Sequence, residues 1–236
     1  TGGRLMNSSF TVATNAVLSI SGAVAKSLLH STVNNAGTIT WTGAGQLIAV
    51  VTGGGQNVLI TNLAGGVFDL QSDSALAYSA PSWGVVAYRF HNAGTLRKSA
   101  GAGTNSFPSQ CSFINTGSVL IQQGAILFPG CQNNGSLTIW EGSSAIFPLG
   151  LVNNGTLDLG TNAVAYLTGG ACSFGPDARL IGSGHWVIPS GDVILTGTIP
   201  SLTWTGGRLV ASSFTVATNA VLSVSGATAK SLVRST

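Results

Sequence analysis

Short apolar runs and short alternations of apolar and polar residues recur along the whole chain. Residues 38–41 (TITW), 137–140 (LTIW) and 157–159 (LDL) alternate, and residues 119–121 (VLI) are continuously apolar. Gly, Asn, Ser or Pro bounds each run, as expected for short β-strands separated by turns. The segment closest to a helical period, residues 16–29, is interrupted by Ser and Gly and contains β-branched residues that favour strands. The pattern predicts an all-β protein.

One turn motif precedes many of these runs: Asn, one or two residues, Gly, then Thr or Ser and an aliphatic residue. Copies start at Val33, His91, Ile114, Asn133 and Val152, and a looser copy starts at Thr61. Their glycines are 28, 29, 23, 18 and 20 residues apart. A period near 20 with loop-sized excesses indicates a solenoid. Because the motif keeps one relation to the following strand, we predict a parallel β-helix with coils of about 20–23 residues, loop insertions and a rise of about 4.8 Å per coil.

In such a stack the turn residues of successive coils lie above one another. We expect the asparagine amides to bond up and down the stack, and the glycines to allow a positive φ at the corner. The predicted structural ladder consists of Asn35, Gly37, Asn62, Gly65, Asn92, Gly94, Asn115, Gly117, Asn133, Gly135, Asn153 and Gly155.

A much longer repeat encloses this short one. Residues 1–32 and 205–236 match at 26 of 32 positions with an offset of 204. We therefore interpret residues 1–236 as a single continuous β-solenoid, in which 1–204 form one repeat unit and 205–236 begin the next. Both copies should adopt the same coils, displaced along one axis, and the natural sequence should continue with residues resembling 33–37.

Several segments resemble very large secreted bacterial proteins built from tandem β-helix repeats, of the kind found in autotransporter passengers and adhesins. They are WTGG-x-L, VNNAGTITW, TNLAGGVFDLQSD, FHNAGTLRKSAGAGT and INTGSVLIQQGAI. The resemblance implies a right-handed helix, an extracellular or cell-surface location, and a role in adhesion or extracellular structure. Motifs of this kind carry no catalytic residues.

Composition narrows the possible partners. Only 6% of the residues are charged, against a usual share of about 25%. The net charge of +3 reflects few charges of either sign, and the densest basic spot is Arg97-Lys98, so nucleic acid is not an expected partner. The longest apolar runs, such as residues 47–51, are far shorter than the ~20 residues that cross a bilayer.

Catalysis would require paired carboxylates or clustered metal ligands. Asp69 and Asp73 are the only acids close in sequence, and we expect both to be solvated at a strand end. His30 is replaced by Arg234 in the second copy, which argues against an essential role. We therefore predict no enzyme activity, no metal and no cofactor.

Tryptophans and cysteines leave alternatives open. Trp41 and Trp140 are expected in the core, although exposed tryptophans could instead stack on sugars. Cys111 and Cys131 are 20 residues apart, so adjacent coils could bring them together as a disulfide, with Cys172 unpaired or linked to another chain. The alternative is three buried, free cysteines.

These patterns together predict a structural segment of an extracellular bacterial fibre, stalk or surface adhesin. Its expected partner is itself, through continuation into a fibre and lateral bundling, with surface glycans as a second class. A carbohydrate-active or carbohydrate-binding β-helix domain is the alternative.

Overall fold

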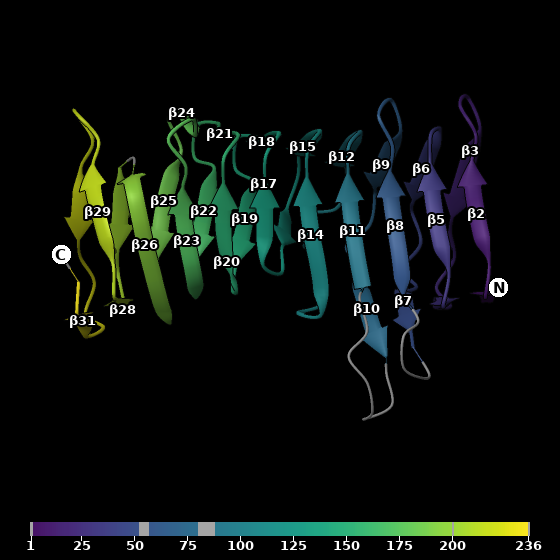
Figure 1. Ribbon diagram of the computed structural model, residues 1–236, viewed down its shortest axis with the longest axis horizontal. Coiled ribbons are helices and arrows are strands. Elements are labelled where there is room, and N and C mark those ends of the chain that lie inside the picture. Colours follow the sequence, from purple (N-terminus) through teal and green to yellow (C-terminus); the bar gives the residue numbers. More distant parts are fainter. Residues whose placement is uncertain (1, 52–56, 80–87, 200, 236) are drawn as a thin grey trace.

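The computed structural model describes residues 2–51, 57–79, 88–199 and 201–235. Its elements are short strands with no helix, and every strand pair is parallel. The chain winds through about ten turns, each contributing strands to three faces, and the two ends of the chain lie at opposite ends of the stack (Figure 1). The prediction of a parallel β-helix is confirmed.

The first face is one long sheet whose strands follow one another turn by turn. They are β2 (Ser9–Val12), β5 (Thr32–Asn35), β8 (Val58–Asn62), β11 (Tyr88–Asn92), β14 (Cys111–Asn115), β17 (Cys131–Asn133), β20 (Gly150–Asn153), β23 (Gly170–Phe174), β26 (Asp192–Ile199), β28 (Gly207–Val210) and β31 (Lys230–Val233), and β29 (Ser213–Val216) pairs with the second half of β26.

The second face is an eight-stranded sheet. Its strands are β3 (Val17–Ile20), β6 (Thr38–Trp41), β9 (Val67–Leu70), β12 (Thr95–Lys98), β15 (Ser118–Ile121), β18 (Ser136–Ile139), β21 (Thr156–Leu159) and β24 (Arg179–Gly182). Two shorter sheets cover the third face. They consist of β1 (Gly3–Met6), β4 (Lys26–Leu29), β7 (Leu47–Val50) and β10 (Leu76–Ser79), and of β13 (Thr104–Ser106), β16 (Ala125–Leu127), β19 (Ser144–Phe147), β22 (Val164–Leu167), β25 (His185–Ile188), β27 (Leu202–Trp204) and β30 (Leu222–Val224).

Side chains alternate between the interior and the surface along these strands, as in the buried, half-buried, buried pattern of β8. The interior is a continuous column of apolar residues. Phenylalanines on successive turns stack in it: the ring centroids of Phe107 and Phe128 are 5.9 Å apart, and those of Phe128 and Phe147 are 5.6 Å apart. Apolar burial on every turn is the main stabilising contribution to the stack.

The turns are less uniform than expected. Equivalent asparagines on successive turns are 27, 30, 23, 18 and 20 residues apart. The predicted coil of about 20–23 residues therefore describes only part of the stack, because corners take up insertions and deletions while the strands stay in register.

The two copies of the long repeat have the same local structure. Strands β1 to β4 of the first copy correspond, at the offset of 204, to β28 to β31 of the second. The left-handed residues other than glycine correspond as well: φ is 49° at Asn7 and 47° at Ala211, and 46° at His30 and 52° at Arg234, whereas Gly207 has a φ of 79° and its counterpart Gly3 is not left-handed. The duplicated sequence thus forms the same strands at two places along the solenoid axis.

Candidate functional site

Six asparagines form a continuous ladder inside the first face. Each ends its strand and is fully buried, and each of the first five donates its Nδ2–H to the Oδ1 of the next asparagine at 2.7 Å. The members are Asn35, Asn62, Asn92, Asn115, Asn133 and Asn153. Five amide-to-amide bonds thus connect six successive turns through their interior.

The same amide group also donates a hydrogen bond to a backbone carbonyl of a second-face strand on the next turn. Asn92 Nδ2 also donates to the Ser118 carbonyl at 2.8 Å, and Asn115 Nδ2 donates to the Ser136 carbonyl at 3.0 Å. Each of these amides therefore joins two turns and two faces. Since an unpartnered buried polar group costs roughly 1–3 kcal/mol, this saturation favours one register of stacking.

The ladder has a direction and two ends. Val12 occupies the position before Asn35, and Phe174 occupies the position after Asn153. At the first end, the Oδ1 of Asn35 is buried and lacks a hydrogen-bond partner among the described residues. The Nδ2 of each of the first five asparagines therefore points toward the C-terminal turns.

The glycines beside the asparagines serve a different purpose from the one expected. A Cβ on Gly117 would lie 2.2 Å from the Gly94 carbonyl oxygen, and a Cβ on Gly135 would lie 2.1 Å from the Gly117 oxygen. Neighbouring turns therefore approach too closely here for any side chain. The expectation of a positive φ at this position is wrong for Gly37, Gly94, Gly117, Gly135 and Gly155.

Gly65 was predicted as a member of the ladder, but it does not take part in the close stacking of glycines. It is the one predicted ladder glycine that has a positive φ, of 82°, and a Cβ there would meet nothing within 4 Å. Gly66 is the residue in the close stack, because a Cβ on Gly94 would lie 2.3 Å from its carbonyl oxygen. The corner between Asn62 and Val67 is longer than in the sister motifs, so the first glycine forms the turn and the second makes the close approach.

Asp69 departs from the expectation of a solvated carboxylate because it is buried, whereas Asp73 is 44% exposed, as expected, and forms an ion pair with Lys98. Asp69 is 1% exposed and accepts hydrogen bonds from Arg97 at 2.7 Å, Gln71 at 2.8 Å and Ser99 at 2.6 Å. Burial raises the pKa of this carboxyl, but the three hydrogen bonds and the Arg97 charge outweigh it, so the pKa is lowered.

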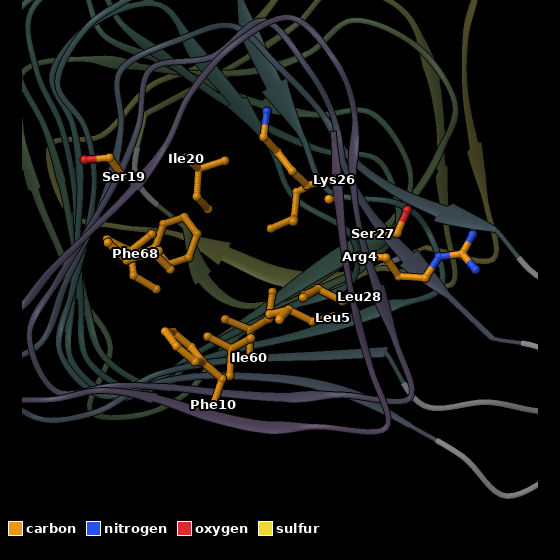
Figure 2. Close-up of a pocket in the computed structure, with 15 residues that line it drawn as sticks. Arg4, Leu5, Phe10, Ser19, Ile20, Lys26, Ser27, Leu28, Ile60 and Phe68 are labelled. Atoms are coloured by element: carbon orange, nitrogen blue, oxygen red, sulfur yellow. The ribbon is translucent and has the colours of Figure 1, made fainter. Parts of the chain in front are cut away.

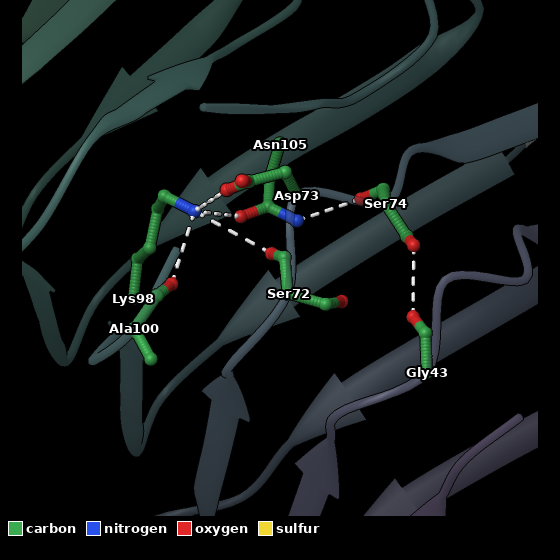
Figure 3. Close-up of polar contacts among 7 residues, drawn as sticks. All are labelled: Gly43, Ser72, Asp73, Ser74, Lys98, Ala100 and Asn105. Atoms are coloured by element: carbon green, nitrogen blue, oxygen red, sulfur yellow. Dashed lines mark hydrogen bonds and ion pairs between the residues drawn. The ribbon is translucent and has the colours of Figure 1, made fainter. Parts of the chain in front are cut away.

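Lys98 is an ammonium group inside the solenoid. It stands in the interior column between Leu70 and Ile121 and is 0% exposed. Its Nζ donates to Asp73 at 2.7 Å and to Asn105 Oδ1 at 2.8 Å, as Figure 3 shows.

Backbone groups complete this cluster. The Lys98 Nζ also reaches two carbonyl oxygens, those of Ala100 at 3.2 Å and Ser72 at 3.4 Å. The hydrogen bond from Lys98 lowers the pKa of Asp73. The two ion pairs thus join the turns of β9 and β12, while the Arg97 Nε is buried without a hydrogen-bond partner among the described residues. Periodicity does not reveal this ion pair, because Lys98 and Asp73 are 25 residues apart and belong to neighbouring turns.

The cysteines do not form the suggested disulfide. Cys111, Cys131 and Cys172 are buried and free. The turn joining Asn115 to Asn133 spans 18 residues, so Cys131 pairs with Phe113 and not with Cys111. Burial raises the pKa of Cys111 to about 12 and that of Cys172 to about 11, which keeps both thiols protonated.

The tryptophans divide between core and surface. Trp41, Trp186 and Trp204 are buried, whereas Trp140 is 48% exposed, so its predicted place in the core is wrong. Trp140 follows Ile139, the last residue of β18, and therefore points to the opposite side of the chain. Trp83 lies outside the described residues. Trp140 is thus the only exposed tryptophan in the described part of the chain, and no row of tryptophans forms there.

The N-terminal end of the solenoid is hollow. A cavity of about 330 Å³ opens there, lined mainly by apolar side chains that include Leu5, Phe10, Leu18, Ile20 and Leu28 (Figure 2). These residues belong to the first turns of the stack, and their inner surfaces face the axis. This cavity is the N-terminal end of the apolar interior column, where no further turn covers it within the described residues.

Comparison with protein-family models, curated protein sequences and solved structures gives no match. Within the described residues, no group of three or more His, Cys, Asp or Glu side chains is placed to hold a metal ion. The same residues include no helix long and apolar enough to span a membrane.

Proposed function

We propose that this chain is a structural segment of an extracellular bacterial fibre, stalk or adhesin built from tandem copies of the 204-residue unit. The observation that carries the proposal is the duplicated segment, which forms the same strands, with the same left-handed residues other than glycine, at both ends of one stack. A unit that continues into a copy of itself with the same strands can be repeated along one axis.

The contacts between turns support a mechanical role. Parallel strands engage the backbone of each turn with the next, and stacked phenylalanines fill the interior. The asparagine ladder and the buried Lys98 add polar links that cross from turn to turn. In this proposal no residue is catalytic, and the paired charges of Asp69 and Arg97 are structural.

Electron microscopy of the native protein tests the fibre. We expect unbranched filaments with an axial repeat of roughly 45 Å, from nine to ten turns of about 4.8 Å each. Compact particles without an axial repeat would overturn the proposal.

Antibody labelling of intact and permeabilised cells of the source organism tests the location separately. The proposal expects labelling of intact cells. Labelling that requires permeabilisation would contradict an extracellular position and would leave the filament test unaffected.

A further inference from the structure

The two copies of the repeat differ in whether other strands pair with their N-terminal edge. In the second copy, β28, β29 and β30 are paired on their N-terminal side with β26 and β27, in the register Asp192 to Arg208, Thr196 to Ser213 and Leu202 to Leu222. In the first copy, the equivalent β1, β2 and β3 pair only with β4, β5 and β6 within the described residues.

The uncovered edge carries the same side chains as the covered one. Arg4, Phe10 and Leu18 stand where Arg208, Phe214 and Leu222 stand in the second copy. The hollow of Figure 2 opens along this edge.

From this match we infer that the outer edge of β1–β3 is a junction surface for residues 192–204 of a preceding copy of the unit, in the register observed between β26–β27 and β28–β30. The inference rests on the proposed function, since it specifies how two units of the fibre meet.

Apolar contacts support this occupant. Within residues 192–204, the core side chains over the second copy are almost completely buried. They are Val193, Leu195, Ile199, Leu202 and Trp204. The same side chains on a preceding unit would fill the hollow and remove its apolar lining from water, which is the main driving force of association.

Charge complementarity supports it as well. The Asp192 carboxylate accepts two hydrogen bonds from the Arg208 guanidinium, with Nε donating at 2.6 Å and Nη2 donating to the other oxygen. Arg4 is the equivalent guanidinium at the open edge. A planar, two-bonded pair fixes orientation as well as contact, so it would help to set the register of the junction.

The junction also determines how units follow one another around the axis. β1 and β4 lie on the third face, whereas their counterparts β28 and β31 lie on the first face. β3 lies on the second face, whereas β30 lies on the third. The second copy is thus advanced by one face, because β26 pairs with β28 through its first half and with β29 through its second half.

The length of the unit follows from this shift. From β2, the first-face sheet passes through nine further strands to β28. Because β28 pairs with the first half of β26 and β29 pairs with its second half, we place β29 one face after β28. One unit therefore spans nine and one-third turns, roughly 45 Å, and three units, roughly 135 Å, restore the same face. A surface group such as Trp140 would consequently point in three directions along a fibre.

Site-directed disulfide trapping on the full 236-residue chain tests the junction. The probe is a synthetic peptide, GDVILTGTIPSLTW, with the sequence of residues 191–204 and a cysteine in place of Thr196 or Thr198. The chain carries Ser9→Cys or Thr11→Cys, the counterparts of positions that pair with Thr196 and Thr198 in the second copy. The native cysteines are buried and provide no competing thiol.

We expect the 196 peptide to link to Ser9→Cys and the 198 peptide to link to Thr11→Cys. The mismatched combinations should give at least about tenfold less product, because a two-residue slip moves the thiols beyond the Cα distance of a disulfide. Arg4→Asp should reduce matched linking, and Asp192→Arg in the peptide should restore it. The chain with Thr196→Cys and Ser213→Cys is the positive control for the linking chemistry.

Equal yields in all four combinations, or no product while the positive control links, would overturn the inference and indicate that another segment covers this edge. The result is independent of the microscopy. Native filaments without matched linking would reject the junction but remain consistent with the proposed fibre. Matched linking without native filaments would reject the fibre, and the outer edge of β1–β3 would then be a binding surface only.

Discussion

Replacing Asn115 with leucine interrupts the asparagine ladder at an inner position. The substitution removes the Nδ2 bonds to Asn133 Oδ1 at 2.7 Å and to the Ser136 carbonyl at 3.0 Å. It also leaves Asn133 Oδ1 buried without a donor, and it removes the Asn115 Oδ1 that accepts from Asn92 Nδ2 at 2.7 Å, while Asn92 Nδ2 keeps its bond to the Ser118 carbonyl. The column itself tolerates apolar side chains, because Val12 and Phe174 occupy its two ends.

The expected cost follows from these lost bonds. One orphaned buried acceptor costs roughly 1–3 kcal/mol, and the lost carbonyl bond adds about 1 kcal/mol, so we expect a destabilisation of about 3 kcal/mol. For a chain of this size, that lowers the midpoint of thermal unfolding by roughly 6–12 °C. Circular dichroism at a fixed heating rate, supported by urea titration, measures the change.

Asn35→Leu is the matched control. It orphans Asn62 Oδ1 in the same way, but it also removes the Asn35 Oδ1 that is already buried without a partner. The end substitution should therefore cost less than the inner one by roughly 1–3 kcal/mol. Equal losses for the two variants, or no loss for Asn115→Leu, would refute a structural role for the amide ladder.

Three further outcomes follow from the same contacts. Gly135→Ala should destabilise by roughly 1–3 kcal/mol in a urea titration, because its Cβ would lie 2.1 Å from the Gly117 carbonyl oxygen. Gly130→Ala should be close to neutral, since its nearest neighbour is at 3.8 Å, and a similar loss in both variants would contradict the close-stacking argument. The three cysteines should stay unreactive toward a thiol reagent in the native state and all react in denaturant, and an intact disulfide by non-reducing mass spectrometry would show this expectation to be wrong. The lowered pKa of Asp69 means that its pairing with Arg97 stabilises the fold at neutral pH, and that this contribution is lost as pH falls below the ordinary value of 3.8 toward the folded pKa. The stability gap between wild type and Asp69→Asn should therefore be present at pH 7 and shrink below about pH 4, and a gap that is constant with pH would refute the assignment.

The repeated turn motif allowed the parallel β-helix to be predicted from the sequence. A turn motif that recurs before equivalent strands requires stacked coils, since equivalent residues then meet equivalent neighbours on every turn. The same logic located the asparagines: six copies of one residue at one corner can satisfy their amides only through one another. No comparable signal marks Lys98, which stands in a column that is otherwise apolar at Leu70 and Ile121.

Only the tertiary structure shows which residues of neighbouring turns lie against each other, because this register depends on the number of residues in each corner. An 18-residue turn sets Cys131 against Phe113, and one further residue after Ile139 turns Trp140 outward, because side chains alternate along a strand. Periodicity fixes which residues repeat, but it does not fix the corner lengths that bring Lys98 beside Asp73. The sequence by itself therefore determined the stack and its asparagine ladder. The register of each turn, the buried ion pairs and the one-face advance of the second copy arise only when the corners close, because they depend on contacts between turns about 20 or more residues apart in sequence.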